Sequence, residues 1–446
     1  MAESEKEITG FSKMGKREKI AWLAKNFLYA NPVEVVKEFA EYWHDNVEAQ
    51  KLLDGFSENT LTNFPVPFGI APNFRINDVV YAVPMVTEES SVVAAASNAA
   101  KYWITRGGFK VEVLSTKKVG QVHFIYHGSK KKLFSFFETI KGDLKQGVKH
   151  ITAKMEERGG GVLDMELFDF TDLEKDYYQL RAYFETVDSM GANFINSCLE
   201  EFGHMLQHMV ATSDQFSDKE KDLEIVMCIL SNYTPDCLVR AEVSCRVAEL
   251  GTFENGEVSA EEFAANFQRA VNIARIDPYR ATTHNKGIMN GIDSVVLATG
   301  NDFRAVEACA HTYACRDGVY RSLSECKVED GIFRFWLTIP IAIGTVGGLT
   351  SLHPLAKRSL ELLGNPNAKK LMEIIACVGL AQNFAALRSL TTSGIQAGHM
   401  KMHLTNILAG YKATDEEIEK AKKHFEETTV SVVAVREFME KLRSGK

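Results

Sequence analysis

The stretch FKVEVLSTKKVGQVHFIY, residues 109–126, marks a change of period in the chain. Within it, Phe109–Leu114 and Gln121–Tyr126 alternate apolar and polar side chains, as strands with one buried face do. The sequence before it is typical of helices instead, over Lys16–Phe27, Pro32–Trp43 and Ser91–Thr105. We therefore predict a helical first part and a sheet that begins near residue 109.

A second pair of strands follows the first after a long amphipathic segment. The glycines Gly159–Gly161 end that segment, because three glycines stop a helix. The predicted strands are Val162–Phe170 and Tyr177–Val187, and a helix from Met190 to Met209 comes next. The order ββαββα predicts an antiparallel sheet covered by two helices, as in ferredoxin-like folds. We expect an α+β protein.

The same pattern predicts how the chain divides into domains. The ferredoxin-like part would be an inserted domain of residues 108–221. It would interrupt a mainly helical domain of residues 1–107 and 222–393, which holds two more predicted strands, Leu223–Leu230 and Val239–Ala248. A small helical domain, 394–446, would follow, and its capping box Thr414-x-x-Glu417 predicts a helix start.

Composition excludes several function classes. The 446 residues carry 51 Lys and Arg against 59 Asp and Glu, a formal charge of −8. An acidic chain is not drawn to nucleic acid or to anionic membranes, so we expect neither partner. The apolar stretch Ile332–Leu352 holds Pro340 and three glycines, so it cannot form a spanning helix.

The cysteines and the N-terminus indicate the compartment. Eight cysteines are scattered without a CxxC pair, which is typical of reduced thiols and offers no metal site. The charged first residues have no apolar core, so we expect no signal peptide. A cytoplasmic protein is predicted.

Two nearby segments are unusually rich in polar groups for a core. They are Asp277–Asp293 and Ala298–Arg304, in which cationic, amide and carboxylate side chains lie among glycines. Such a pattern favours hydrogen bonding to a ligand, and a solvated loop with a surface ion pair is the alternative.

Three further candidates are weak when taken singly. His399 is more often a surface histidine by base rate, and Glu88-Glu89 would ordinarily be a first-turn pair at a helix start. Asp188 stands at a strand-to-helix junction, where it is a sound N-cap. The same junction aims free backbone N–H groups at any bound phosphate.

Together these segments resemble the class II 3-hydroxy-3-methylglutaryl-CoA reductases of bacteria and archaea. The resemblance is carried, in the family's order, by EESSVVA at 88–94, DSMGAN at 188–193, THNKGIMNGID at 283–293, ATGND at 298–302, VGG at 346–348, GLAQN at 379–383 and GIQAGHM at 394–400. It implies a large helical domain for substrate and dimerisation, an inserted domain for the nicotinamide cofactor, and a C-terminal flap. It also implies homodimers with shared active sites, assembled in some members into hexamers.

The resemblance implies a four-electron reduction of hydroxymethylglutaryl-CoA to mevalonate and CoA, or its reverse, with two NAD(P)H. Lys286, which we place on a His-Asn-Lys-Gly turn, would stabilise the oxyanion, and Asp302 would hold that lysine. Glu89 would be the general acid at the carbonyl oxygen. His399, on the flap, would protonate the CoA thiolate.

The resemblance also implies how the substrate binds. Arg280 would bind the terminal carboxylate of the substrate, for which a guanidinium fork is suited. Ser91 and Asn290 would donate hydrogen bonds to the hydroxymethylglutaryl group. A CoA-phosphate contact is less well supported, because the family's Phe-Arg-x-Leu segment reads here Phe11-Ser12-Lys13-Met14.

The cofactor would lie on the inserted domain. Its pyrophosphate would meet the helix start that holds Asp188, Met190, Gly191, Ala192 and Asn193. Family members that use NAD carry an aspartate before the glycine-rich stop, and that position here is Thr152, near Lys154. A neutral residue among lysines favours NADPH, with NADH as the alternative.

Two other functions remain as alternatives. One is a thiolase or lyase acting on acyl-CoA through Cys309 or Cys315, although no Cys/His arrangement supports it. The other is a catalytically silent scaffold of the same fold. Such a scaffold would have no need of Glu89, Lys286, Asp302 and His399 together.

Overall fold

The computed structural model describes residues 6–253, 256–392, 404, 407–425, 428 and 430–444. The chain divides into two compact units, residues 1–67 and 68–446. The first unit is helical, and its elements are α1 (Lys16–Leu23) with a π-helical continuation (Ala24–Leu28), α2 (Pro32–Ala40) and α3 (Val47–Asp54). Ile20, Ala24 and Val35 form its small core. The two helices predicted here are confirmed: the first continues in π-helical form to Leu28, just past its predicted end at Phe27, and α2 ends at Ala40, before its predicted end at Trp43.

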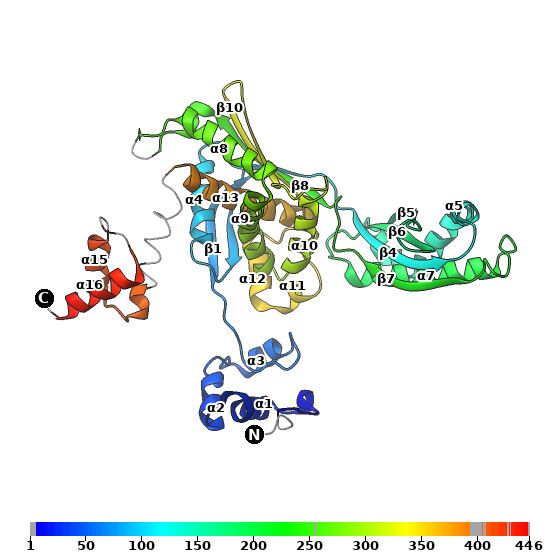
Figure 1. Cartoon of the computed structure of the whole chain (residues 1–446), viewed down its shortest axis with the longest axis horizontal. Helices are drawn as coiled ribbons and strands as arrows, with labels where there is room; N and C mark the ends of the chain where they lie inside the picture. The colour runs from blue at the N-terminus through cyan, green and yellow to red at the C-terminus, as the bar shows by residue number, and fades with distance from the viewer. Residues whose placement is uncertain are drawn as a thin grey trace. The chain divides into compact units, whose positions relative to one another are not determined.

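The second unit begins with a hairpin of β1 (Phe68–Ile76) and β2 (Val79–Val86), which leads into α4 (Val92–Ile104). A four-stranded sheet of order β3-β8-β10-β9 follows. Its strands are β3 (Lys110–Val113), β8 (Leu238–Arg246), β9 (Ser324–Glu329) and β10 (Ile332–Pro340). The helices around it are α8 (Ala260–Ile276), α9 (Pro278–Ala298), α10 (Phe303–Ala314), α11 (Leu349–Leu352), α12 (Pro354–Leu362) and α13 (Ala368–Thr391) (Figure 1).

A second four-stranded sheet, of order β5-β6-β4-β7, forms the inserted domain. Its strands are β4 (Lys118–Tyr126), β5 (Gly161–Asp169), β6 (Tyr177–Glu185) and β7 (Leu223–Leu230), and its helices are α5 (Lys130–Gly147), α6 (Lys149–Glu156) and α7 (Ala192–Thr212). All its pairings are antiparallel. The predicted α+β class with antiparallel sheets is confirmed.

The order of strands in this domain differs from the prediction. The first predicted strand, β3, pairs with β8 of the other sheet, and β7 pairs with β4 although it lies beyond the predicted boundary at residue 221. The inserted sheet is therefore built as βαββαβ rather than ββαββα. Alternation identifies extended segments, but pairing depends on residues far away in the chain. The rest of the predicted domain division stays a prediction.

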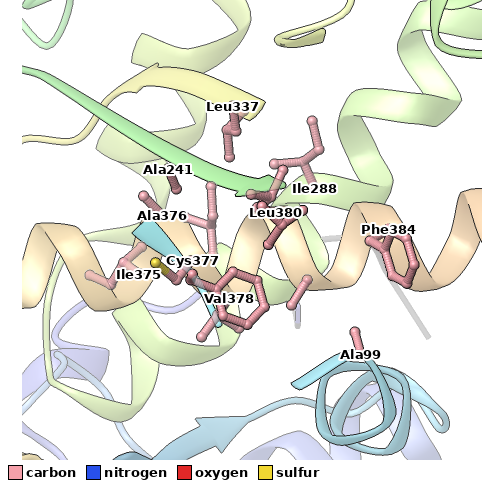
Figure 2. Packing of buried hydrophobic residues seen from close by; sticks show 14 of the residues in the cluster. Ala99, Ala241, Ile288, Leu337, Ile375, Ala376, Cys377, Val378, Leu380 and Phe384 are labelled. Carbon is pink, nitrogen blue, oxygen red and sulfur yellow. The ribbon is translucent and has the colours of Figure 1, made fainter. Parts of the chain in front are cut away.

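Helix α13 runs through the main hydrophobic core. Figure 2 shows Ile375, Val378 and Leu380 of α13 gathered with Ile288 of α9 and Leu337 of β10. Among the described residues, α13 alone is long and apolar enough to cross a membrane on length and composition, yet 83% of its most apolar window is buried inside the protein. That burial is typical of a core helix. The apolar stretch Ile332–Leu352 is a strand followed by a loop and α11, as its proline and glycines predict.

The C-terminal part contains α15 (Asp415–His424) and α16 (Val432–Ser444). Thr414 and Glu417 form the predicted capping box, because each side chain accepts a hydrogen bond from the other residue's backbone N–H. Leu404, Leu408, Val435 and Met439 form a small core of their own.

Candidate active site

The polar segment 277–293 is helical, so the predicted turn around Lys286 and the solvated-loop alternative are both wrong. Asp277 caps α9 by accepting hydrogen bonds from the backbone N–H groups of Tyr279 and Arg280, and Pro278 occupies the first turn. One face of α9 is buried, as His284, Ile288 and neighbouring apolar residues show. Lys286 therefore projects from the middle of a rigid helix, which fixes its position better than a turn would.

Lys286 and Glu89 lie together although 197 positions separate them in the sequence. The Lys286 Nζ donates a hydrogen bond of 2.7 Å to Glu89 Oε2. Glu89 comes from the turn between β2 and α4, where Ser91 adopts a left-handed backbone with φ of 78°. The side chains are 59% and 42% exposed in this single chain. The structure thus brings together two of the four predicted catalytic residues.

Asp302 is placed differently from the prediction. Its carboxylate caps α10 by accepting from the backbone N–H groups of Arg304 and Ala305, and it pairs with Arg304 Nε at 3.1 Å. It makes no ion pair with Lys286 among the residues that the structure describes. The unsatisfied N–H groups at the start of α10 account for its orientation. His399, the fourth predicted catalytic residue, lies outside the described residues.

A cavity of about 330 Å³ opens beside the Lys286–Glu89 pair. Ser91 and Asn290, both predicted to bind substrate, line it together with Glu89. The Ser91 hydroxyl and the Gln382 carbonyl oxygen are buried and have no hydrogen-bond partner in the described part of the chain. Buried polar atoms without partners are costly, so they indicate places where a ligand can donate or accept.

Arg280 does not line this cavity in the single chain. It projects from the first turn of α9, is partly buried, and makes no ion pair among the described residues. Burial lowers the pKa of its guanidinium. The pKa of His284, one turn further on, falls to about 3, first through burial and then through the Arg280 charge. Arg280 is therefore a cation for which the described residues supply no anionic partner.

Sequence reasoning missed several residues of the cavity. Asn98 of α4 and Gln382, Arg388 and Ser389 of α13 line it as well. Gln382 belongs to the GLAQN motif, so a signal for it existed. Arg388 lies in an apolar helical run without any motif, and only the packing of α13 against α4 places it here.

The predicted cofactor segment forms the start of α7, but its cap differs from the prediction. Gly191, with φ of 87°, is the N-cap of α7, and no side chain caps the helix. An added Cβ at Gly191 would lie 2.4 Å from the Thr186 methyl group, so the position requires glycine. Asp188 instead accepts a hydrogen bond of 2.8 Å from the backbone N–H of Ala368, the first residue of α13.

Thr152 does not face solvent. Its side chain is fully buried and donates a hydrogen bond of 2.7 Å to Glu156 within α6. This corrects the prediction that Thr152 meets the adenosine ribose. Counting back from the glycines identified Thr152 in the sequence, but Thr152 lies on the buried face of α6, and this face determines where its side chain points. Lys154, on the same helix, is exposed.

The alternative cysteine nucleophiles are poorly placed for catalysis. Cys309 is buried and accepts a hydrogen bond from the Thr234 backbone N–H, and burial raises the pKa of its thiol. A reactive cysteine needs the thiolate, which burial disfavours. Cys315 is exposed at the end of α10, away from the cavity that Glu89 lines.

Comparison with known proteins decides the family. A family model described as hydroxymethylglutaryl-coenzyme A reductase matches residues 17–404. The chain belongs to this family. It is therefore an oxidoreductase, and the resemblance inferred from the motifs is confirmed.

Two curated members of the reductase family are similar over most of their length. The 3-hydroxy-3-methylglutaryl-coenzyme A reductase of Archaeoglobus fulgidus is 34% identical over 422 residues, covering 92% of this chain and 91% of the relative. A probable reductase of the same name from Borreliella burgdorferi is 32% identical over 394 residues, covering 86% of both chains.

A solved structure agrees with the fold. The class II reductase of Streptococcus pneumoniae, described as bound to NADPH in open conformations, has a TM-score of 0.71 and 34% identity, covering 86% of this chain and 99% of that one. The predicted class II architecture is thereby confirmed.

Proposed function

We propose that this chain reduces 3-hydroxy-3-methylglutaryl-CoA to mevalonate and CoA with two molecules of NADPH. The observation that carries the proposal is the Lys286–Glu89 pair, joined at 2.7 Å beside a cavity lined by Ser91 and Asn290. The pair places a cation and a carboxyl group at one point, which is what reduction of a carbonyl requires. Family membership selects the substrate.

Lys286 and Glu89 would act on the carbonyl oxygen of the thioester. The Lys286 ammonium stabilises negative charge that develops on this oxygen, and such electrostatic stabilisation is often the largest catalytic contribution. Glu89, within hydrogen-bond distance of the same ammonium, would deliver a proton to the oxygen. NADPH, when bound, supplies the hydride for each of the two reductions.

The second half of the reaction needs a proton for the CoA thiolate. By their motifs alone, we assign this role to His399. On the same basis, we assign to Asp302 the role of holding Lys286 in position. A proton at the thiolate sulfur would prevent it from recapturing the aldehyde before the second reduction. Asp302 would need to turn away from Arg304 to reach the lysine.

The start of α7 fits the pyrophosphate of NADPH. The helix has no side-chain cap and no acidic residue in its first turn, so the N–H groups of Ala192 and Asn193 are free of a capping side chain. Such N–H groups bind phosphate and add the favourable end of the helix dipole. Met190 and Gly191 would approach the cofactor closely.

NADPH is preferred over NADH in this proposal. A cavity of about 280 Å³ near the α7 start is lined by Arg158 and Lys369, whose charges suit a 2′-phosphate. Asp188 and Glu185 line the same cavity, so we place the 2′-phosphate beside Arg158 and Lys369 rather than beside these carboxylates. The solved pneumococcal relative is described as bound to NADPH.

The assembly we propose is a homodimer with active sites shared between subunits. Lys286 and Glu89 are substantially exposed in the single chain, and a second subunit would exclude water from them. We also propose that the dimers can assemble into trimers of dimers and that the protein is cytoplasmic. In this proposal the large domain binds substrate and forms the dimer, the inserted domain binds the cofactor, and the C-terminal domain is the flap.

The proposed reaction is tested by absorbance at 340 nm. Purified protein with hydroxymethylglutaryl-CoA and NADPH should lose absorbance and consume about two NADPH for each mevalonate formed. NADH in place of NADPH should give a lower kcat/KM. No loss of absorbance with either nucleotide, for a folded protein, would contradict the proposal.

A further inference from the structure

Arg388 lines the cavity that Glu89 lines, and among the described residues it is a cation without an anionic partner. It projects from α13, is partly buried, and belongs to the cavity wall with Asn98 of α4. Its guanidinium makes no hydrogen bond or ion pair with any residue that the structure describes. In the described part of the chain its cation–π neighbours are Tyr102 and Phe384, whose ring centroids lie 5.5 and 5.9 Å from its central carbon.

The surroundings of Arg388 disfavour its charged form and, among the described residues, supply no carboxylate to balance that charge. Burial lowers the pKa of the Arg388 guanidinium, and the nearby positive charge of Arg106 lowers it further, whereas Tyr102 raises it. The central carbon of the Arg106 guanidinium lies 3.9 Å from the centroid of the Tyr102 ring, and Arg106 Nε donates a hydrogen bond to the backbone carbonyl oxygen of Glu249. As far as the structure describes the chain, these side chains thus bring together two guanidinium groups and no carboxylate.

A partly desolvated guanidinium with five donors and no acceptor destabilises a fold. Cation–π contacts at 5.5 Å or more offset this only in part, because their strength falls with distance. Unpaired cations of this kind are retained where a ligand supplies the anion, and a guanidinium is suited to carboxylate or phosphate oxygens. No other arginine or lysine among the described residues lines this cavity.

We propose that Arg388 binds an anionic group of the acyl-CoA substrate in the cavity between α4 and α13. This inference rests on the proposed function and deepens it, because it assigns a substrate-binding cation that differs from Arg280. The anionic group is either the terminal carboxylate of the acyl part or a phosphate of CoA. Both present oxygens to the same guanidinium fork.

Separate ligands distinguish these two sources. Mevalonate carries the carboxylate and no phosphate, and CoA carries the phosphates and no such carboxylate. Isothermal titration of each ligand should show that Arg388→Gln weakens one of them by about tenfold or more and leaves the other unchanged. Arg388→Lys should be intermediate, because lysine keeps the charge and loses the fork.

A matched control removes a positive charge elsewhere. Arg358 of α12 is exposed and pairs with Glu361, and it does not line the cavity. Arg358→Gln should bind both ligands as the parent protein does. Arg388→Gln should keep or raise the melting temperature, because it removes an unpaired charge, and this separates a binding role from a structural one.

Several outcomes would overturn the proposal. They are unchanged binding of both ligands to Arg388→Gln, equal weakening of both, or loss of assembly in sedimentation with ligand binding intact. The last result would assign the anion to a second copy of the chain. Reductase turnover is measured on the parent protein in parallel. If the parent protein is active, these outcomes contradict the role of Arg388 and leave the proposed function standing.

Discussion

The Lys286 ammonium donates to the Glu89 carboxylate at 2.7 Å, and both residues lie beside one cavity. Lys286 is held by α9, whose buried face packs on α13, and Glu89 by the turn that opens α4. Because α4 and α13 also form the cavity wall, the same packing that builds the core sets the distance between the two side chains. Changes in that packing should therefore affect activity and stability together, whereas changes at the pair itself should affect activity alone.

Replacing Lys286 should abolish turnover and leave the fold intact. Lys286→Ala removes the proposed stabiliser of the oxyanion, so we expect kcat to fall by about 10²- to 10³-fold or more. The melting temperature should hardly change, because an ion pair 59% and 42% exposed contributes little to stability. Lys327→Ala, which breaks the surface pair with Glu329, is the control and should keep full activity. Near-normal turnover of Lys286→Ala would refute the assigned role.

Two glycines of α9 should respond in opposite ways to alanine. At Gly291 an added Cβ would lie 2.8 Å from the Val378 carbonyl oxygen and 2.9 Å from Gln382 Cβ, so Gly291→Ala should cost about 1–3 kcal/mol by forcing α9 and α13 apart. At Gly287 no described residue beyond the adjoining turns of α9 lies within 4 Å of an added Cβ, so Gly287→Ala should stabilise by up to about 1 kcal/mol.

Urea unfolding of the two glycine variants tests this expectation. The two changes add the same methyl group to the same helix, so intrinsic helix propensity cancels between them. Equal stabilities would show that α9 and α13 do not approach as closely as the structure places them.

Removing the acceptor at Asp188 should weaken the start of α13. The Asp188 carboxylate accepts from the Ala368 N–H at 2.8 Å, so Asp188→Ala should lower the free energy of unfolding by about 0.5–2 kcal/mol. Asp188→Asn keeps an acceptor and should lose much less. Chemical denaturation at neutral pH measures both. If alanine and asparagine behave alike and near the parent, the hydrogen bond does not contribute to stability.

Asp293 should make stability depend on pH. Burial and then the neighbouring Glu307 raise its pKa to about 8. A carboxyl whose pKa is raised on folding holds more protons in the folded state, so its contribution is complete below the unfolded value of about 4 and is lost as pH rises through about 8. Asp293→Asn cannot ionise and should therefore be more stable than the parent at pH 8.5.

Unfolding at two pH values checks this sign. At pH 3 the parent and Asp293→Asn should differ little, since the acid is mostly neutral in both the folded and the unfolded state. The advantage of the variant should grow toward pH 8.5. An equal difference at both pH values would mean that Asp293 does not titrate abnormally.

Local sequence signals were sufficient for much of this protein. The capping box at Thr414 and Glu417, and the two strands that Gly159–Gly161 precede, follow from residues close together in the chain. The motifs also identified Lys286 and Glu89 and the family. Each of these rests on backbone preferences or on short patterns, which do not require knowledge of distant residues.

Tertiary packing decided the rest. It determined which sheet contains β3 and which contains β7, because alternation alone does not specify strand pairing. It also placed Ala368, 180 positions away, where its N–H donates to Asp188, and it buried Thr152 inside the protein. It also brought Arg388 into the cavity wall, where no described residue forms an ion pair with it. Strand pairing, burial and ionic partners depend on contacts between residues distant in sequence, and a single sequence records the residues but not which of them meet.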